Sequence, residues 1–364
     1  MELTKCKLGE LITQRREKND GSDLPICGVS KDGLIPPKQK DADTSIYNVF
    51  YRDDFIFNPA RMELNSIAIN DMYDRAICSS LYEVFYVHRT DLLLPHYLKL
   101  IIRQKWFTRY CEFLGQGSAR EYCRFGNISE IEIEFPPIEE QQKIVDYNTA
   151  IENRIALKQK INDNLEAQAN AIFSSSAPDF TDLQPIHNFG MVITGKTPPT
   201  SVAEYYGNDI PFIKTPDMHG NVYITSSECS LSKAGADSQK NKYIPENTVV
   251  VACIGANAGE VALTSYIAQT NQQINAVISK YPCFLYFSIK AHTAELRTLG
   301  EGSSTMININ KTSFEKYEIP TPSDNTLQQL EHKLSIVFST ILHNLQEIDR
   351  LNETKDLLVT QLSR

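Results

Sequence analysis

The chain has 364 residues, of which 41% are hydrophobic and 22% are charged, and its formal net charge is −9 at pH 7. This is the composition of an ordinary soluble globular protein, and the length is enough for two to three domains with their own cores. No stretch approaches the roughly 18 uncharged apolar residues of a membrane span, and the N-terminus lacks an apolar signal-peptide core, so we expect a cytoplasmic protein with no membrane partner.

Composition also limits the chemistry. The eight cysteines are scattered without a Cys-x-x-Cys pair, and the seven histidines form no metal-ligand spacing. We therefore expect no metal site and no redox motif, and we expect the cysteines to be small buried apolar residues. No Ser/His/Asp arrangement can be argued from the spacing, so no catalytic residue is assigned. The acidic balance argues mildly against nucleic acid as a partner, although charge can be segregated to one face.

The first 135 residues alternate short β-rich runs with turns that contain Asp, Asn and Pro. A helix-like run covers Leu94–Phe113, and a strand follows at Ile131–Phe135. Earlier strands are predicted at Ser45–Val49, Asp54–Phe57, Ser66–Ile69 and Tyr82–Val87.

A long helix is predicted from Pro136 to Phe173. The two prolines at its start end the preceding extended segment, and two glutamates stand in the first turn, where negative charge is favoured. The next proline is Pro178. At 1.5 Å per residue this helix would be roughly 50 Å long. Its apolar stripe holds Ile144, Ile151, Leu165 and Ile172, with Lys158 as the one polar break.

A second long helix with a clearer apolar seam ends the chain. Apolar residues recur at alternating spacings of three and four, which indicates a coiled coil. Asn344 is a polar residue on the seam of the kind that fixes register, and Lys355 is expected to extend its ammonium to the seam's edge. The seam positions are Leu330, Leu334, Val337, Ile341, Asn344, Ile348, Leu351, Lys355, Leu358 and Leu362.

The two halves of the chain follow the same order of motifs, which predicts an internal duplication. Matching pairs are Gly9 with Gly190, the Gly-x-Gly-Ser turns at 115–118 and 300–303, and the strands that end before each long helix. A pseudo-twofold axis that crosses the helices would pair them antiparallel, with the globular parts at opposite ends of a rod. An axis along the rod would instead make the helices parallel.

Two motifs have a catalytic and a structural interpretation. Gly255–Glu260 follows an apolar strand but lacks the spacing of a phosphate-binding loop, so a tight turn is favoured. Phe57-Asn58-Pro59-Ala60 is similar to the Asn-Pro-Pro-aromatic motif of adenine methyltransferases, but the second proline and the aromatic residue are missing. No glycine-rich cofactor loop precedes it. We interpret it as a structural turn.

Five stretches together carry a resemblance to a known family. They are EFPPIEEQQKIVDYNTAIENRIALKQKINDNLEAQANAIF at the centre, Phe55–Ile69, Ile210–Met218, Val249–Leu263 and Thr270–Ile278. Taken in their order along the chain, they resemble the specificity subunits of Type I restriction–modification systems over nearly the whole chain. The stretch before the C-terminal helix, IPTPSDNTLQQL, departs from the Pro-Pro-x-x-Glu-Gln pattern found before the central helix.

The resemblance implies an α+β fold, with two target-recognition domains of mixed α/β content separated by two long antiparallel helices that form a coiled coil. The expected boundaries are 1–135 for the first recognition domain, 136–178 for the central conserved helix, 179–322 for the second recognition domain, and 323–364 for the C-terminal conserved helix. A rod of about 50 Å would span roughly 15 base pairs, so a gap of unread DNA is expected between two half-sites.

The resemblance further implies a non-catalytic subunit that binds double-stranded DNA with a split recognition sequence. Its expected partners are two methyltransferase subunits, which would use S-adenosylmethionine to methylate adenine, and a motor–nuclease restriction subunit. No cofactor is expected in this chain itself. Two alternatives stay open: a coiled-coil scaffold whose globular ends bind protein partners, and a DNA-modifying enzyme in its own right. The missing cofactor loop and the missing acidic/lysine nuclease cluster argue against the enzyme.

Candidate DNA contacts are basic and amide residues in turns, because cations neutralise phosphates while Arg, Asn and Gln can read base edges. For each lone basic residue, a solvated surface charge is the competing interpretation, and for the amides it is a buried hydrogen-bonding role. The candidates are Lys38, Lys40, Arg52, Arg61, Arg120 and Arg124 in the first half, and Lys196, Lys214, Lys240, Lys242, Asn271, Gln272, Ser303 and Lys311 in the second.

Overall fold

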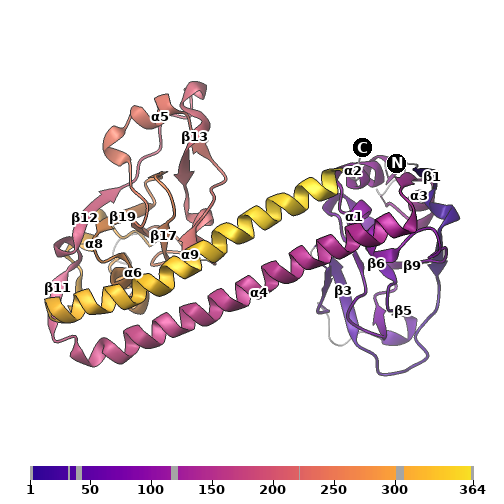
Figure 1. Ribbon diagram of the computed structural model, residues 1–364, viewed down its shortest axis with the longest axis horizontal. Coiled ribbons are helices and arrows are strands. Elements are labelled where there is room, and N and C mark those ends of the chain that lie inside the picture. The colour runs from indigo at the N-terminus through magenta and orange to yellow at the C-terminus, as the bar shows by residue number, and fades with distance from the viewer. Residues whose placement is uncertain are drawn as a thin grey trace. The chain divides into compact units, whose positions relative to one another are not determined.

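The computed structural model describes residues 3–31, 33–37, 43–115, 122–220, 222–300 and 307–361. The chain divides into two compact units (Figure 1). Unit 1 comprises Met1–Arg154 together with Asn352–Arg364, and unit 2 comprises Ile155–Leu351. Each unit combines β-sheets with helices, so the predicted α+β class is confirmed.

Unit 1 contains two four-stranded sheets and a two-stranded ribbon. One sheet has the order β2 (Ile12–Arg15), β9 (Glu83–Val87), β6 (Phe55–Phe57), β7 (Ile67–Ile69), and all its pairs are antiparallel. The other has the order β4 (Gly33–Ile35), β3 (Ile26–Ser30), β8 (Arg75–Cys78), β5 (Asn48–Tyr51), with β3 parallel to β8. The ribbon joins β1 (Thr4–Lys7) to β10 (Glu132–Phe135).

The core of unit 1 lies between the first sheet and its helices, α1 (Pro95–Ile102), α2 (Lys105–Gly115) and α3 (Phe125–Ser129). Phe55 stacks on Phe85 of the neighbouring strand at 5.0 Å between ring centroids, and both are buried. The single predicted helix over 94–113 is wrong. Gln104 is buried and its backbone N–H bonds to Ile101 O at 3.0 Å, a tight turn that ends the first helix before the second begins.

Three of the four predicted early strands are present within one residue at each end, but the strand predicted at Ser45–Val49 is shifted. Thr44–Ile46 forms a single 3-10 turn, and the strand begins at Asn48. The side chain of Asp43 accepts a hydrogen bond from Ser45 N at 3.0 Å and so caps the turn. This local cap competes with strand formation at those residues.

Unit 2 repeats the arrangement of unit 1 with longer connections. Its main sheet has the order β12 (Gly190–Thr194), β19 (Ile274–Ser279), β16 (Val249–Ala252), β17 (Val261–Thr264), β14 (Tyr223–Ile224). A smaller sheet has the order β15 (Ser230–Leu231), β13 (Tyr206–Ile213), β18 (Gln269–Thr270), and β11 (Asp182–Pro185) pairs with β20 (Glu318–Thr321). The short helices are α5 (Lys233–Asp237), α6 (Pro282–Ala291), α7 (Thr293–Thr298) and α8 (Lys311–Lys316).

Most sheet pairings of one unit have a counterpart in the other, except the pair of β5 with β8 in unit 1 and that of β14 with β17 in unit 2. In unit 1, β2 pairs with β9 and β9 with β6; in unit 2, β12 pairs with β19 and β19 with β16. The parallel pair of β3 and β8 has its counterpart in β13 and β18, and each unit closes with a two-stranded ribbon. The topology therefore bears out the duplication that the sequence predicts.

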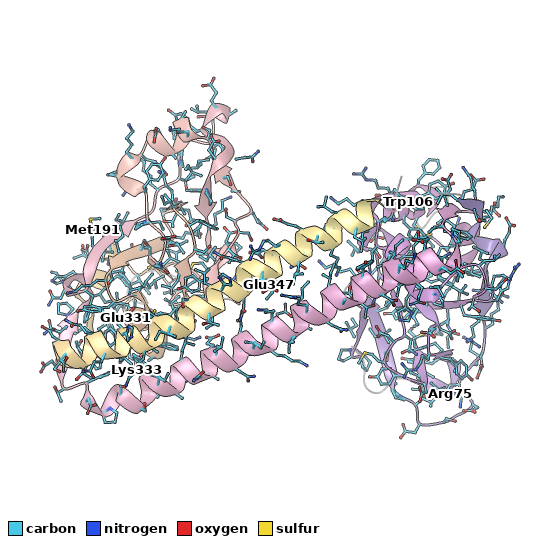
Figure 2. The ribbon with its side chains drawn as sticks, viewed as in Figure 1. Arg75, Trp106, Met191, Glu331, Lys333 and Glu347 are labelled. Carbon is cyan, nitrogen blue, oxygen red and sulfur yellow. The ribbon has the colours of Figure 1, made fainter. Side chains whose placement is uncertain are left out.

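The two long helices are α4 (Ile138–Ser176) and α9 (Asp324–Gln361), close to the predicted ranges. Within unit 2 their segments run antiparallel, because Lys158 Nζ lies 2.9 Å from Glu347 while Asn162 bonds to Asn344 at 2.8 Å. Figure 2 labels Glu347 on α9. Within unit 1 the remaining segments face each other through an ion pair of 2.9 Å between Glu152 and Lys355. Inside unit 2 the antiparallel alternative is the one observed.

The predicted seam of α9 faces inward. The predicted seam residues from Leu330 to Leu358 are buried or half-buried, and Leu362 lies outside the described residues. Lys355 pairs with a carboxylate instead of only extending past the seam. In unit 2 the helices also reach the core, since Phe173 stacks on Phe287 of α6 at 5.4 Å and Phe338 packs edge-on against Phe287 at 5.6 Å. In the part of the chain that the structure describes, we find no helix with the length and apolar character needed to cross a membrane.

Candidate nucleic-acid interface

Several predicted DNA contacts of unit 2 gather where the strands of its sheets end. Thr194 ends β12, Ile213 ends β13, and Thr270 ends β18, and backbone bonds join the loops that follow them. Lys196 N donates to Thr270 O at 2.9 Å, and Asn271 N donates to Ile213 O at 3.1 Å. We call residues 194–197, 213–215, 239–242 and 271–273 the loop edge of unit 2. Sheet topology, which brings distant segments together, creates this edge.

The lysines of this edge differ in whether their ammonium groups have a partner within the protein. Lys242 Nζ donates to Thr194 O at 2.9 Å, and Lys214 Nζ lies 2.8 Å from Cys229 Sγ, a hydrogen bond that raises the pKa of the Lys214 ammonium. Lys196 and Lys240 are exposed and form no ion pair among the described residues. The edge therefore carries four ammonium groups, two of which are held in place by the fold.

The two amide candidates at this edge have different surroundings. Asn271 is only 8% exposed, and both ends of its amide bond to Gln273, at 3.1 Å in each case. The buried hydrogen-bonding interpretation describes Asn271. Gln272 is exposed, and its Oε1 accepts a bond from Thr197 Oγ1 at 2.7 Å, which orients the side chain. Its amide nitrogen makes no hydrogen bond within the described part of the chain, so Gln272 is the better placed of the two for a base.

Lys311 does not belong to the loop edge. Its Nζ pairs with Glu315 one turn along α8, at 3.1 Å. The backbone O of Glu315 lies 2.9 Å from His187 Nδ1, which places α8 beside the segment that precedes β12. The loop edge lies at the other end of β12, so Lys311 lies apart from the lysines of that edge.

In unit 1 the three described arginine candidates are not equivalent. Arg52 bonds to Asp74 at 3.0 and 3.1 Å, and Arg124 pairs with Glu83 at 3.2 Å, so both charges are already compensated. Arg61 is exposed and has no ion pair with any described residue. The candidates Lys38, Lys40, Arg120 and Ser303, and most of both Gly-x-Gly-Ser turns, lie outside the described residues.

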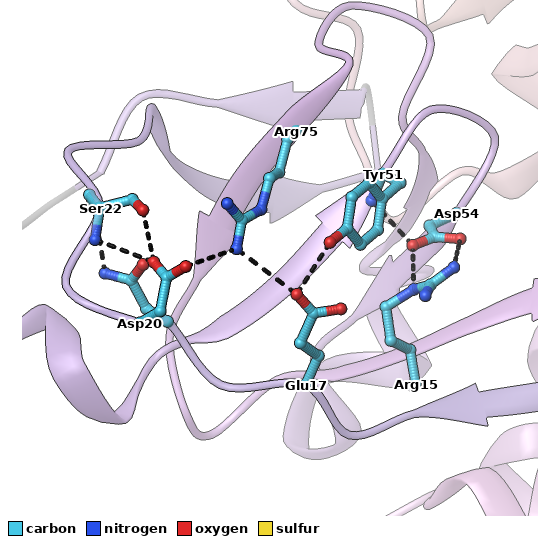
Figure 3. A network of polar contacts seen from close by, with 8 residues as sticks. Arg15, Glu17, Asp20, Ser22, Tyr51, Asp54 and Arg75 are labelled. Carbon is cyan, nitrogen blue, oxygen red and sulfur yellow. Dashed lines mark hydrogen bonds and ion pairs between the residues drawn. The ribbon is translucent and has the colours of Figure 1, made fainter.

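A polar network that sequence reasoning missed joins the strands of unit 1 (Figure 3). Arg15 makes two bonds to the buried carboxylate of Asp54, at 2.6 and 3.1 Å, and its guanidinium lies over the rings of Tyr51 and Tyr86. Burial raises the pKa of Asp54 above its ordinary value, while the bond from Arg15 opposes that shift. Arg15 and Asp54 are 39 positions apart, so no local pattern signals the pair. We assign it a structural role.

A second part of the network consists of half-buried groups and the exposed carboxylate of Asp20. Tyr51 donates its hydroxyl to Glu17 at 2.8 Å, and Arg75 bonds to Glu17 and Asp20, both at 3.4 Å. Hydrogen bonds from the hydroxyl and backbone N–H of Ser22 lower the pKa of Asp20 to about 2. These bonds fix the chain between β2 and β3.

The glycine-rich segment at 255–260 is a tight turn, as expected. Gly255 and Gly259 have φ values of 84° and 90°, which side chains other than glycine rarely adopt. Arg297 donates to two carbonyls of the turn, at 2.7 and 2.9 Å. The neighbouring cavity of about 530 Å³ also contains Lys290, which pairs with Glu166 at 2.6 Å. Because these cations are occupied, the turn lacks the free positive charge of a phosphate site.

The Asn58-Pro59 motif is likewise a turn. The side chain of Asn58 accepts a bond from Ala60 N at 3.1 Å, and Pro59 opens the 3-10 segment Pro59–Leu64. Among the described residues no group of three or more His, Cys, Asp or Glu side chains could hold a metal ion. The eight cysteines are free, and six of them are buried.

The geometry thus describes two α+β units that share most of their strand pairings, each continuous with segments of both long helices. A family model, the Type I restriction modification DNA specificity domain, matches residues 6–167 and 184–353. The chain belongs to this family. The two matched ranges correspond to the two halves of the internal repeat.

Individual relatives agree with this assignment. The specificity subunit of the Type I restriction enzyme HindI from Haemophilus influenzae is 30% identical over 355 residues, which covers 75% of this chain and 77% of that protein. The MjaIX specificity subunit from Methanocaldococcus jannaschii is 28% identical over 182 residues, covering 48% of this chain and 42% of the relative.

The fold has a counterpart among solved structures. The S subunit of a Type I restriction-modification system from M. genitalium superimposes with a TM-score of 0.64 and covers 99% of this chain and 96% of that one. The sequence identity of that pair is 12%, so the likeness concerns the fold.

Proposed function

We propose that this chain is a non-catalytic recognition subunit that binds double-stranded DNA with a split target, each unit reading one half-site. The observation that carries the proposal is that the match to a DNA specificity family covers both halves of a repeat, whose two units share most of their strand pairings. A duplicated reader is the simplest way for one chain to recognise two separated sequences. On this proposal the recognition domains are residues 1–135 and 179–322, and the spacer helices are residues 136–178 and 323–364.

A recognition subunit needs partner subunits that modify and cut the DNA, and the family resemblance implies which ones. Two methyltransferase subunits would bind the chain and methylate adenine, with S-adenosylmethionine bound in those subunits and no cofactor in this chain. A motor–nuclease subunit would cut unmodified DNA. We place the complex in the cytoplasm, where its DNA substrate is found.

The net charge of −9 fits a reader that works inside a larger complex. Ammonium groups are concentrated at the loop edge of unit 2, at Lys196, Lys214, Lys240 and Lys242, while the chain as a whole is acidic. Partner subunits would supply the rest of the positive surface around the duplex. The isolated chain should therefore bind DNA weakly and with strong salt dependence.

The test is to co-express the chain with its methyltransferase partner and to map the methylated adenines. Replacing residues 1–135 by the same region of a relative should change one half of a bipartite motif and leave the other half intact. Unchanged specificity after the exchange would favour a scaffold that binds protein. Methylation by the chain without a partner would favour an enzyme.

A further inference from the structure

Matching the strand pairings of the two units identifies the part of unit 1 that corresponds to the loop edge of unit 2. Matching of sequence motifs did not find it. In unit 2 the loop 271–273 precedes β19, and the end of β16 lies beside it, since Ala252 pairs with Ile274. In unit 1 the loop 79–82 precedes β9 in the same way, and Phe57 at the end of β6 pairs with Glu83. The loop 79–82 is therefore the counterpart of the unit 2 loop that carries Asn271 and Gln272, and Lys31 follows β3 as Lys214 follows β13. The β6–β7 connection (58–66) corresponds to the glycine turn after β16 and lies beside the loop 79–82.

This edge of unit 1 is hollowed. A cavity of about 910 Å³ lies between the β3–β4 hairpin, the β6–β7 connection and the loop 79–82. Its lining includes Lys31, Arg61, Leu64 and Leu81. The volume lies within the range of roughly 300–1,000 Å³ typical of ligand sites.

The rim of the cavity combines exposed apolar groups with free cations. Leu81 is 79% exposed and Leu64 is 60% exposed, although both are large apolar side chains. Lys31 and Arg61 are exposed and have no ion pair among the described residues, and Glu63 is a carboxylate that lines the same cavity. Exposed apolar side chains beside unpaired cations, at the rim of one cavity, suit a ligand that has both a polyanionic backbone and an apolar group.

We propose that this cavity receives the major-groove edge of the DNA half-site read by unit 1, and that Leu81 contacts the 5-methyl group of a thymine there. Arg61 holds the adjacent phosphate. The inference rests on the proposed function and extends it by naming a specificity-determining residue and its base.

The chemistry of the groove supports this assignment. Hydrogen-bonding groups dominate the major-groove edges of the bases, and the thymine methyl is their apolar feature. An aliphatic side chain such as Leu81 can therefore discriminate at a thymine. Gln272 occupies the matching loop of unit 2 and offers an amide, which would read a different base in the other half-site. The two units would thus differ in specificity through equivalent loops.

The test uses the full chain co-expressed with its methyltransferase partner in cells that lack adenine methylation, followed by mapping of methylated adenines. Leu81→Gln should remove the thymine requirement at one position of one half-site, with loss of the roughly tenfold or greater preference that one matched base pair confers. The other half-site and the gap should not change. Arg61→Gln should reduce methylation of every site in proportion without altering the motif.

Leu3→Gln is the matched control, because Leu3 is another leucine of unit 1, is 44% exposed and does not line the cavity. It should leave the motif unchanged. Leu81→Ala is a second variant with a smaller change in polarity, and circular dichroism verifies folding of both. An unchanged motif in both folded Leu81 variants, or a half-site without thymine, would overturn the inference. If the exchange of residues 1–135 still alters that half-site, the proposed function survives; if the exchange alters nothing, the proposed function itself fails.

Discussion

At the residue scale, two buried polar side chains tie the long helices to the units. Gln141 of α4 is fully buried in unit 1, where it accepts a bond from Leu94 N at 2.9 Å and donates to Leu92 O at 2.7 Å. In unit 2 the carboxylate of Glu331 accepts bonds from Cys283 N at 3.1 Å and Phe284 N at 2.8 Å, at the start of α6 (Figure 2). Each side chain satisfies backbone groups at or near the start of a helix, which would otherwise be buried without partners.

Glu331 should be important for the stability of unit 2. Glu331→Ala leaves two buried N–H groups unsatisfied, so we expect the free energy of unfolding to fall by about 2–4 kcal/mol. Lys333→Ala, an exposed change two residues away on the same helix, should alter it by less than about 0.5 kcal/mol. Denaturant titration of both variants measures the difference, and equal stability of the two would contradict the role of Glu331.

The same carboxyl makes stability depend on pH. Burial raises the pKa of Glu331 above its ordinary value of 4.5, so the folded chain binds this proton more tightly than the unfolded chain. Its contribution is complete below pH 4.5 and is lost as the pH rises through the raised pKa. The stability of wild type relative to Glu331→Gln should therefore fall over that interval, and an identical slope for both proteins would exclude the effect.

At the element scale, the helix pair is joined in part by polar contacts. Lys158 lies between Glu347 at 2.9 Å and Asn344 at 2.8 Å, and Asn344 bonds to Asn162. Lys158 and Glu347 are 23% and 19% exposed. A polar layer of this kind favours one register, because a shifted helix would leave these groups without partners.

A double-mutant cycle on Lys158 and Glu347 should give a coupling energy of about 1–2 kcal/mol, since the pair is shielded from water. The pair of Lys143 and Glu140 is the control, because it is also at short distance, 2.6 Å, but its side chains are 62% and 35% exposed. That pair should couple by less than about 0.5 kcal/mol. Chemical unfolding measures both, and equal couplings would show that the shielded pair has no special role.

How much of these elements the sequence predicts depends on how local the signal is. The long helices and most of the early strands of unit 1 follow from periodicity, proline and turn residues within a short window. Each long helix has a Gln-Gln pair near its start, Gln141-Gln142 and Gln328-Gln329, but the two pairs do not play the same part. Gln141 is buried, whereas Gln328 is exposed, and Glu331, one turn later, bonds to the backbone in its place. Such a shift depends on how α6 docks, which no local pattern encodes.

The candidate site residues also divide into those with a local sequence signal and those that only the fold brings together. Lysines in turns could be found as residue types, but their grouping at the loop edge of unit 2 arises from strand order, as does the separation of Lys311. No local pattern singles out Leu81, because an exposed leucine in a loop is ordinary. Only the strand pairing shows that it occupies the position in unit 1 that Gln272 occupies in unit 2. The Arg15–Asp54 pair was hidden for the same reason.

At the scale of the whole molecule, the proposed function requires two DNA-reading units and a spacer of fixed length. The helices α4 and α9 have 39 and 38 residues. At 1.5 Å per residue each is about 55–60 Å long, which equals roughly 16–18 base pairs of duplex. We propose that this length sets the unread gap between the half-sites.

The most direct test inserts one heptad into each helix, after Arg154 and after Leu351, where the two units divide. A heptad adds about 10.5 Å, or roughly three base pairs, and preserves the seam. With the methyltransferase partner co-expressed, mapping of methylated adenines should show both half-sites unchanged and the gap between them lengthened by about three base pairs. A gap of unchanged length, or a change in the sequence of either half-site, would contradict the account.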